Sequence, residues 1–170
     1  MARHQGPVLV DTNVIIECWR IRAWKALVGG YSVETVEYCV VETQTGLQRR
    51  RPEQQIDYQE LLATLAAVHP VSDVERAEAV LRDDQVSYLD LGEQMLWAHA
   101  LTRNDAWVLC GPDKASLRTG IRLGLGDRLV SLERLLEDVG LRPGGLREAY
   151  TRRWQERTLG ELTALEGRRP

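Results

Sequence analysis

Short apolar runs alternate with longer stretches of helical periodicity, and this alternation is the feature that most limits the folds open to the chain. The runs lie at 7–10, 107–110 and 128–130, and two further candidate strands are the β-rich segment 31–36 and the short segment 68–71. Runs this short and this apolar are typical of parallel strands that are buried on both faces. Strands that alternate with helices predict an α/β fold of three α/β/α layers, with a central, mostly parallel sheet.

The stretches between these runs predict the helices. Ser72-Asp73-Val74-Glu75 matches a capping box, and Asp90 is suited to cap the helix that follows it. Further helices are expected after Asn13 and at 37–47, 57–67, 91–103, 113–123 and 132–139. The glycines within 140–145 mark a boundary. We therefore expect a main domain at 1–140 and a helical C-terminal extension at 141–170, and its 170 residues suit one main domain.

Composition sets limits on the class of protein. With 44% hydrophobic and 28% charged residues, the chain is typical of a folded domain. No run approaches the roughly 20 apolar residues of a membrane helix. Only about four apolar residues precede Asp11, too few for a signal peptide. We therefore expect a cytoplasmic protein with no membrane association.

Cysteine content and net charge add two further limits. Cys18, Cys39 and Cys110 form no CxxC pair and lie in apolar runs, so buried reduced thiols are expected rather than a zinc site. The net charge of −3 neither supports nor excludes a nucleic-acid substrate, because basic residues gather locally in Arg49-Arg50-Arg51 and in the C-terminal extension.

Two acidic residues follow predicted strands. Asp11 comes directly after the first strand, and Asp113 lies just beyond the strand that ends at Cys110. Ligands of parallel sheets bind outside the carboxyl ends of the strands, so these two side chains are expected to converge. Glu42 and Glu93 lie on predicted helices among apolar neighbours, where a carboxylate is costly to bury unless it is paired or bound to a metal.

Each acid also has a structural interpretation. Asp11 suits a helix cap, Glu42 a solvated helix face, and Glu93 a first-turn position favoured by the helix dipole. Asp113 suits a turn, and Asp90 suits a cap alone. The functional interpretation therefore depends on the whole set and its order rather than on any member.

Four converging carboxylates would raise each other's pKa. A divalent cation reverses this effect, and Mg²⁺ or Mn²⁺ prefers oxygen ligands. Such an ion lowers the pKa of bound water and neutralises charge on a phosphodiester. The acidic set therefore suits metal-dependent phosphodiester hydrolysis without a catalytic His or Cys.

The order of these motifs resembles PIN-domain nucleases. Val-Leu-Val-Asp11-Thr12-Asn13 is similar to the opening of that family, and Val-Val-Glu42 to its second acidic motif. Leu-Asp-Leu-Gly-Glu93, Leu-Cys-Gly-Pro-Asp113-Lys and the closing segment Arg-Leu-Val-Ser-Leu-Glu-Arg-Leu-Leu are similar to its later motifs. The resemblance spans roughly residues 7 to 140.

The resemblance implies a role for each matching residue. Asp11, Glu93 and Asp113 would hold Mg²⁺ or Mn²⁺, and Glu42 would complete the catalytic set directly or through water. Thr12 and Asn13 would order Asp11 or contact metal-bound water. The chain departs from the family pattern at two positions. The third acid is Glu93 where Asp is frequent, so Asp90 could share its role. Gly111 stands where Thr or Ser is common.

Other residues remain open between structure and function. Arg118 and Arg122 share one helix face beyond Asp113 and are candidate RNA contacts, or a solvated face. Arg49-Arg50-Arg51 has the same two interpretations. Trp19 and Trp24 are expected in the core rather than at a partner site, and His99 is expected to be packed rather than catalytic.

The leading functional hypothesis is a metal-dependent endoribonuclease. Many relatives of this size are VapC-type toxins, so the resemblance implies an antitoxin protein and a homodimer in addition to an RNA substrate. A PIN nuclease of RNA processing without an antitoxin, and an inactive PIN binding module, are the alternatives. A phosphatase of the haloacid-dehalogenase type is disfavoured because it needs a second Asp where Asn13 stands.

Overall fold

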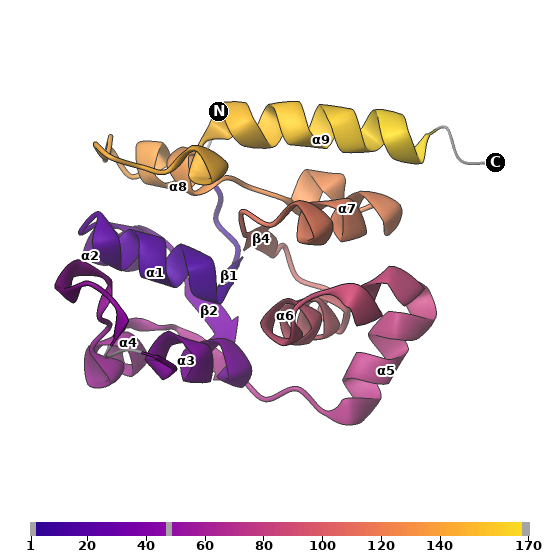
Figure 1. Cartoon of the computed structure of the whole chain (residues 1–170), viewed down its shortest axis with the longest axis horizontal. Coiled ribbons are helices and arrows are strands. Elements are labelled where there is room, and N and C mark those ends of the chain that lie inside the picture. Colours follow the sequence, from indigo (N-terminus) through magenta and orange to yellow (C-terminus); the bar gives the residue numbers. More distant parts are fainter. Residues whose placement is uncertain (1–2, 47–48, 168–170) are drawn as a thin grey trace.

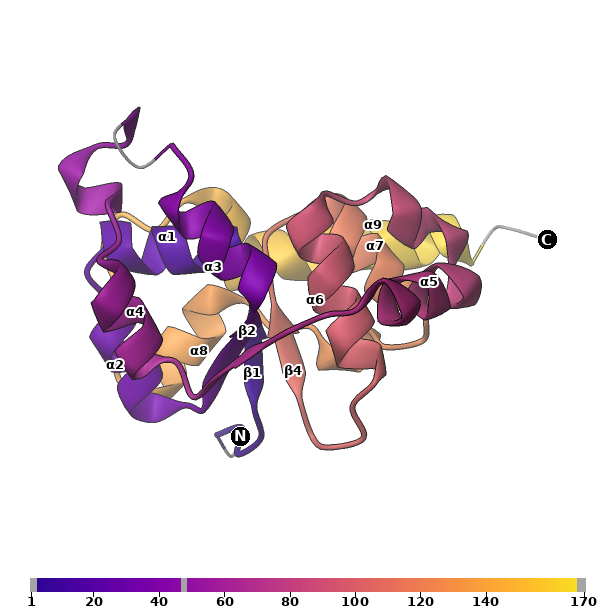
Figure 2. The same ribbon diagram turned by 90° about the horizontal axis from the view of Figure 1, so that it is seen from below.

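The chain folds around a four-stranded parallel sheet with helices on both faces. The computed structural model describes residues 3–46 and 49–167. The strands β1 (Val8–Val10), β2 (Val33–Val36), β3 (Ala67–His69) and β4 (Val108–Cys110) take the order β3-β2-β1-β4. Val8 is in register with both Val33 and Val108. The predicted three-layer α/β/α architecture with a parallel sheet is therefore confirmed (Figures 1 and 2).

Helices connect the strands and form the two outer layers. Their bounds are α1 (Thr12–Arg20), α2 (Trp24–Gly30), α3 (Glu37–Gln44), α4 (Tyr58–Thr64), α5 (Asp73–Arg82), α6 (Leu91–Leu101), α7 (Lys114–Arg122), α8 (Leu132–Asp138) and α9 (Arg152–Glu166). Short 3₁₀ turns lie at η2 (Pro52–Gln54), η3 (Asp84–Tyr88), η4 (Gly126–Arg128) and η5 (Glu148–Tyr150). Figure 2 shows α1, α2, α4 and α8 on one side of the sheet and α5, α6 and α7 on the other.

The alternation of side chains along each strand divides the interior into two cores. Val8 and Val10 pack into the core beneath α1, α2, α4 and α8, whereas Leu9 packs into the core beneath α5 and α6. Cys110 and Leu109 divide in the same way on β4. Successive strand residues point to opposite faces, so an all-apolar strand supplies both cores.

Local signals begin several helices as predicted. Ser72 and Glu75 form both hydrogen bonds of a capping box at α5. Asp57 caps α4 in a similar way, through the backbone N–H of Glu60. The three cysteines are free and buried, as expected.

Two local predictions were wrong. The expected strand at 128–130 is reduced to one parallel bridge between Leu109 and Leu129, next to a hydrogen bond from Val130 N–H to the Leu109 carbonyl. The turn η4 ends at Arg128 and α8 begins at Leu132, which leaves too little extended chain for a longer pairing. Asp90 occupies the N-cap position of α6, but its side chain makes no capping hydrogen bond.

The C-terminal extension packs on the main domain. α9 lies along α7, as Figure 1 shows, and buries Gln155, Thr158 and Leu162. Glu17 of α1 is fully buried and accepts a hydrogen bond from the backbone N–H of Arg147 at 3.1 Å. The extension thus covers one end of the α/β layers rather than standing apart from them.

No helix among the described residues is both long enough and apolar enough to span a bilayer.

Candidate metal-binding active site

Asp11 and Asp113 reach the same edge of the sheet from adjacent parallel strands. Asp11 follows β1, and its Oδ1 accepts a hydrogen bond from Val14 N–H at 2.8 Å. Asp113 follows β4, and its Oδ1 accepts from Ser116 N–H at 3.0 Å. Both residues therefore cap helices and also belong to the acidic site, because a helix that starts beyond a parallel strand places its cap at the carboxyl edge.

Glu42 and Glu93 come from α3 and α6, which pack against each other at the same edge. Thr12 Oγ1 donates to Glu42 Oε1 at 3.0 Å. The Thr12 hydroxyl is therefore directed at α3 rather than at Asp11, and its expected contact with metal-bound water stays a prediction. Asn13 is exposed and lines the pocket.

Gly92 allows α3 and α6 to approach closely. A Cβ atom at this position would lie 2.1 Å from Glu42 Oε1. A glycine within a predicted helix, directly before Glu93, is a sequence signal that could have indicated this close contact between α3 and α6.

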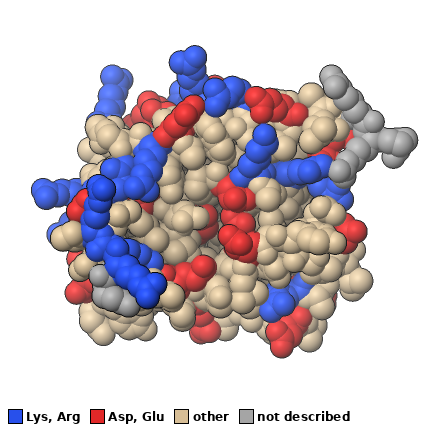
Figure 3. All heavy atoms as spheres, viewed as in Figure 1, with Lys and Arg blue, Asp and Glu red and all other residues tan. Residues whose placement is uncertain are grey.

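These residues surround one small pocket. It has a volume of about 150 Å³ and is lined by Asp11, Thr12, Asn13, Cys39, Glu42, Asp90, Gly92 and Glu93. Asp113 lies beside it and raises the pKa of both Asp11 and Glu93. In Figure 3, acidic side chains gather near the centre of one face, while Lys and Arg side chains lie mainly along its left and upper margins.

Burial and mutual repulsion raise the pKa of three carboxyls in this pocket, those of Asp11, Glu42 and Glu93. Asp11 is 4% exposed, and burial, followed by the charges of Asp113 and Glu42, raises its pKa to about 7. Burial raises the pKa of Glu93 to about 8, with further contributions from Asp113, Asp11 and Asp90. Burial also raises the pKa of Glu42, although the hydrogen bond from Thr12 opposes the shift.

Asp90 stands at the rim as a fifth carboxylate. It is exposed, lines the pocket and raises the pKa of both Glu42 and Glu93. Since it does not cap α6, its carboxylate is available to the pocket. The sequence suggestion that Asp90 shares the role of Glu93 stays a prediction.

The donor set fits a hard divalent cation. The carboxylates supply oxygen ligands, and no ion pair within residues 3–46 and 49–167 neutralises Asp11, Glu42, Asp90, Glu93 or Asp113. Among the described residues, no three of these acids each place an oxygen within 4.8 Å of the other two. At this spacing an ion would contact one or two of the carboxylates directly and the others through water, as Mg²⁺ commonly does.

A second cluster lies near the other end of α6. Single ligand atoms of Glu34, His69 and His99 lie within 4.8 Å of one another, a geometry that could suggest a metal site. Arg103 Nη1, however, contacts Glu34 Oε2 and lies 3.4 Å from His69 Nε2 and 3.1 Å from His99 Nε2. The guanidinium therefore holds the place that a cation would take. His99 is packed, as expected, and stacks on His69 with ring centroids 3.9 Å apart.

The arginines proposed from sequence as RNA contacts have partners within the protein. Arg122 Nε donates to Asp83 at 2.7 Å, and both Arg118 and Arg122 pair with Glu166 of α9. Arg50 donates to the carbonyl oxygens of Glu42 and Thr45 at 2.9 and 3.1 Å, so it caps the end of α3. The flanking Arg49 and Arg51 are exposed.

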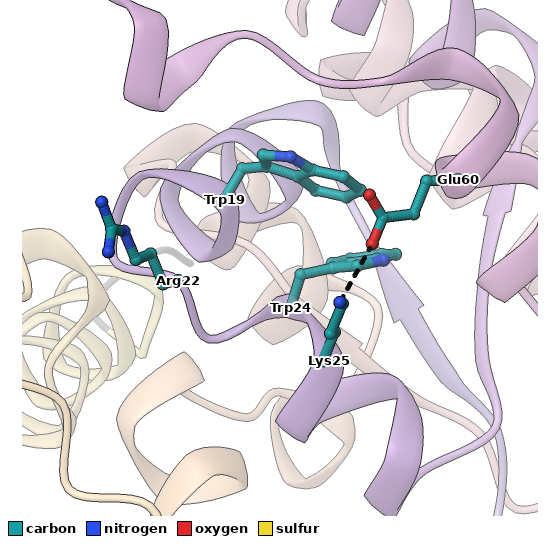
Figure 4. Close-up of a pocket in the computed structure, with 5 residues that line it drawn as sticks. All are labelled: Trp19, Arg22, Trp24, Lys25 and Glu60. Atoms are coloured by element: carbon teal, nitrogen blue, oxygen red, sulfur yellow. Dashed lines mark ion pairs between the residues drawn. The ribbon is translucent and has the colours of Figure 1, made fainter.

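The tryptophan pair lies at the end of α1 remote from Asp11. Trp24 is 3% exposed and its indole N–H donates to Thr64 at 2.8 Å, which confirms it as a core residue. Trp19 is partly buried against it and borders a depression of about 310 Å³ (Figure 4). Lys25 and Glu60 pair across that depression at 3.9 Å.

No known protein family matches the chain in a comparison with family profiles. No curated protein matches it significantly in sequence either.

Proposed function

We propose that this protein is a metal-dependent endoribonuclease of the PIN type. Asp11, Glu93 and Asp113 would hold Mg²⁺ or Mn²⁺, and Glu42 would complete the catalytic set. The observation that carries the proposal is the burial of Asp11 and Glu93 beside further acids, with no ion pair from the described chain to compensate them. Buried charges in proteins are usually paired with an opposite charge or coordinate a metal, so unpaired buried acids support a site for a cation from solution.

The chemistry follows from the types of ligand. When bound, the ion would lower the pKa of a coordinated water molecule and neutralise charge on the phosphodiester. Glu42, held by Thr12 at 3.0 Å, would help to orient the attacking water. The small pocket limits the number of solvent molecules around the reacting groups, which strengthens each electrostatic interaction.

RNA is the proposed substrate on the strength of the PIN-like order of motifs around Asp11, Glu42, Glu93 and Asp113. The narrower form of the proposal is the toxin of a toxin–antitoxin pair, with an antitoxin that blocks the site and a homodimer as the active unit. A small antitoxin gene directly upstream would favour this form. A nuclease of RNA processing would share the same site but lack that gene.

The test is cleavage of total cellular RNA by purified protein with Mn²⁺ or Mg²⁺, compared with EDTA. We expect discrete metal-dependent fragments, and a rate at least about 100-fold lower for Asp11→Asn and Asp113→Asn. Asp73→Asn is the matched control, because the Asp73 side chain is 99% exposed on α5. Cleavage that survives both site substitutions would refute the assignment of the site.

Metal binding gives an independent measurement. Titration with Mn²⁺, followed by electron paramagnetic resonance, should detect binding in the unmodified protein and in Asp73→Asn, but much weaker binding in Asp11→Asn. Mn²⁺ binding without cleavage of any RNA would favour the alternative of an inactive PIN binding module.

A further inference from the structure

We propose that the apolar pocket between η3, α7 and α9 binds an unpaired base of the RNA strand that is cut at the acidic site. This inference rests on the proposed function and names the form of substrate: a single strand, or an unpaired loop, with one base inserted beside the scissile phosphate.

The pocket adjoins the acidic site through two short chain segments. Tyr88 and Leu89 line it directly before Asp90, and Lys114 and Ala115 line it directly after Asp113. A strand whose phosphate lies at the acids therefore passes the pocket within a nucleotide or so. The depression at Trp19 has no such continuity, since α1 places it about 12 Å from Asp11 at 1.5 Å per residue.

The shape and chemistry of the pocket suit a base. Its volume is about 360 Å³, near the lower end of small-ligand sites. Leu89 and Leu162 are buried at 6% and 3% exposure, whereas Tyr88 is 81% exposed. An exposed aromatic ring beside an apolar wall offers a surface on which a base can stack.

Polar groups at the margin suit the rest of a nucleotide. The Lys114 side chain is 61% exposed, and its pair with Glu161 at 3.6 Å is open to water, so its ammonium group is available to a backbone phosphate. Gln85 also lines the pocket, and its side-chain amide can hydrogen-bond to the edge of a base. Arg118 and Arg122 are paired with acidic residues of the chain, so they form part of the pocket wall and are not the proposed phosphate contact.

These features imply selection for unpaired RNA. A base within a duplex must leave its stack to enter the pocket, at a cost of a few kcal/mol, whereas a base in a loop is already free. A protein partner is the less favoured occupant, because a stable interface buries about 1,200 Å² or more. Of the large apolar side chains that are substantially exposed in the described part of the chain, two, Tyr88 and Leu165, line this pocket.

The test is the binding of a fluorescently labelled ten-nucleotide RNA of mixed sequence, followed by anisotropy, with Ca²⁺ in place of Mg²⁺ to limit cleavage. We expect the single strand to bind at least 10-fold more tightly than the same strand in a duplex. Tyr88→Ala should weaken single-strand binding about 10-fold, while Tyr88→Phe and Tyr88→Trp should retain it. Tyr58→Ala is the matched control, because Tyr58 is 45% exposed at the start of α4.

The two lysines provide a second matched pair. Lys114→Ala should weaken binding and reduce the slope of log affinity against log salt by about one. Lys25→Ala should change neither quantity, although Lys25 also belongs to an exposed ion pair.

The outcomes separate this inference from the proposed function. If RNA is cleaved but Tyr88→Ala binds and cleaves like the unmodified protein, the base pocket is refuted and the pocket is left to a protein partner. If binding depends on Tyr88 but no RNA is cleaved, the base pocket stands and the nuclease proposal fails. If the protein neither binds nor cleaves RNA, both fail.

Discussion

The two ends of α6 bury carboxylates in opposite ways. Glu93 near its start and Glu34 beside its end are each 8% exposed. Burial raises the pKa of Glu93 to about 8, with added repulsion from Asp113 and Asp11. Burial acts on Glu34 in the same direction, but hydrogen bonds from Arg103 and His69 outweigh it and lower the pKa of Glu34.

The difference lies in the partners and not in the depth of burial. At Glu34 the chain supplies its own cation, so the cluster is complete and joins β2, β3 and the end of α6. At Glu93 the chain supplies only further acids, which is costly for stability. The proposed metal ion would offset that cost. Substitutions and changes of pH can test this contrast between the two ends of α6.

The largest effect is expected from Arg103→Ala. It leaves Glu34 buried without its cation, so the free energy of unfolding should fall by about 4 kcal/mol. Arg82→Ala is the control, because Arg82 is exposed on α5. Urea denaturation measures both, and a loss below about 1 kcal/mol for Arg103→Ala would show that the cluster contributes little to stability.

The next effect is a pH dependence of stability without divalent metal. Asp11 and Glu93 have raised pKa values in the folded protein, so the folded state holds protons that the unfolded chain has already lost. Stability therefore falls as pH rises from about 4, where the unfolded carboxyls ionise, to about 7 and 8, where the folded ones do. Between pH 6.5 and 9 the loss should reach roughly 3 kcal/mol, at 1.36 kcal/mol for each pKa unit.

The other end of α6 should respond in the opposite direction over an overlapping range. Burial, His69 and Arg103 lower the pKa of His99 to about 4, so the unfolded chain binds its proton first. Stability from this source is lost as pH falls below about 6.5. Denaturation in EDTA from pH 5 to 9 measures the sum of the two effects, and the Asp11→Asn/Glu93→Gln variant isolates the contribution of His99. The alkaline decline should disappear in Asp11→Asn/Glu93→Gln and be reversed by Mg²⁺; a decline unchanged in that variant would point to other groups.

A smaller effect is expected from Gly92→Ala. The added methyl would meet Glu42 Oε1 at 2.1 Å, so the carboxylate must move away from its hydrogen bond with Thr12. We expect RNA cleavage to fall about 10-fold, equivalent to 1.4 kcal/mol of barrier. Gly160→Ala is the control, since a Cβ on Gly160 of α9 meets nothing within 4 Å. Equal rates for the two variants would contradict a close α3–α6 contact.

The smallest effect is expected from Thr12→Val. It removes the hydroxyl that donates to Glu42 Oε1 while it keeps a similar side-chain volume. The cleavage rate should fall about 5-fold, in line with about 1 kcal/mol for one hydrogen bond. Thr12→Ser should restore most of the rate. If valine and serine act alike, the hydroxyl does not position Glu42.

The sequence was most informative where the physical cause is local. Short apolar or β-rich segments predicted the parallel strands, and Ser72 with Glu75 predicted the start of α5. Asp11 and Asp113 could be placed together because parallel strands end at a common edge. The strand expected at 128–130 failed because its pairing depends on neighbouring turns and not on its own residues.

The sequence was less informative about partners. Glu34 stands inside an apolar strand, a signal that it needs compensation, but only the packing of α6 on the sheet brings Arg103 and His69 to it. The direction of the Thr12 hydroxyl, the freedom of Asp90 from capping and the pairing of Arg122 with Asp83 also depend on contacts between distant segments.

By itself, then, the sequence determined the order of most strands and helices along the chain, because periodicity and capping act over a few residues. It also placed Asp11 and Asp113 at the carboxyl edge of the sheet, because each follows a parallel strand. The tertiary structure decided which buried charges are neutralised within the chain and which have no ion-pair partner among the described residues. Burial and ion pairing depend on distances across the fold. Glu34 and Glu93 are equally exposed, yet the groups that pack beside them shift their pKa values in opposite directions.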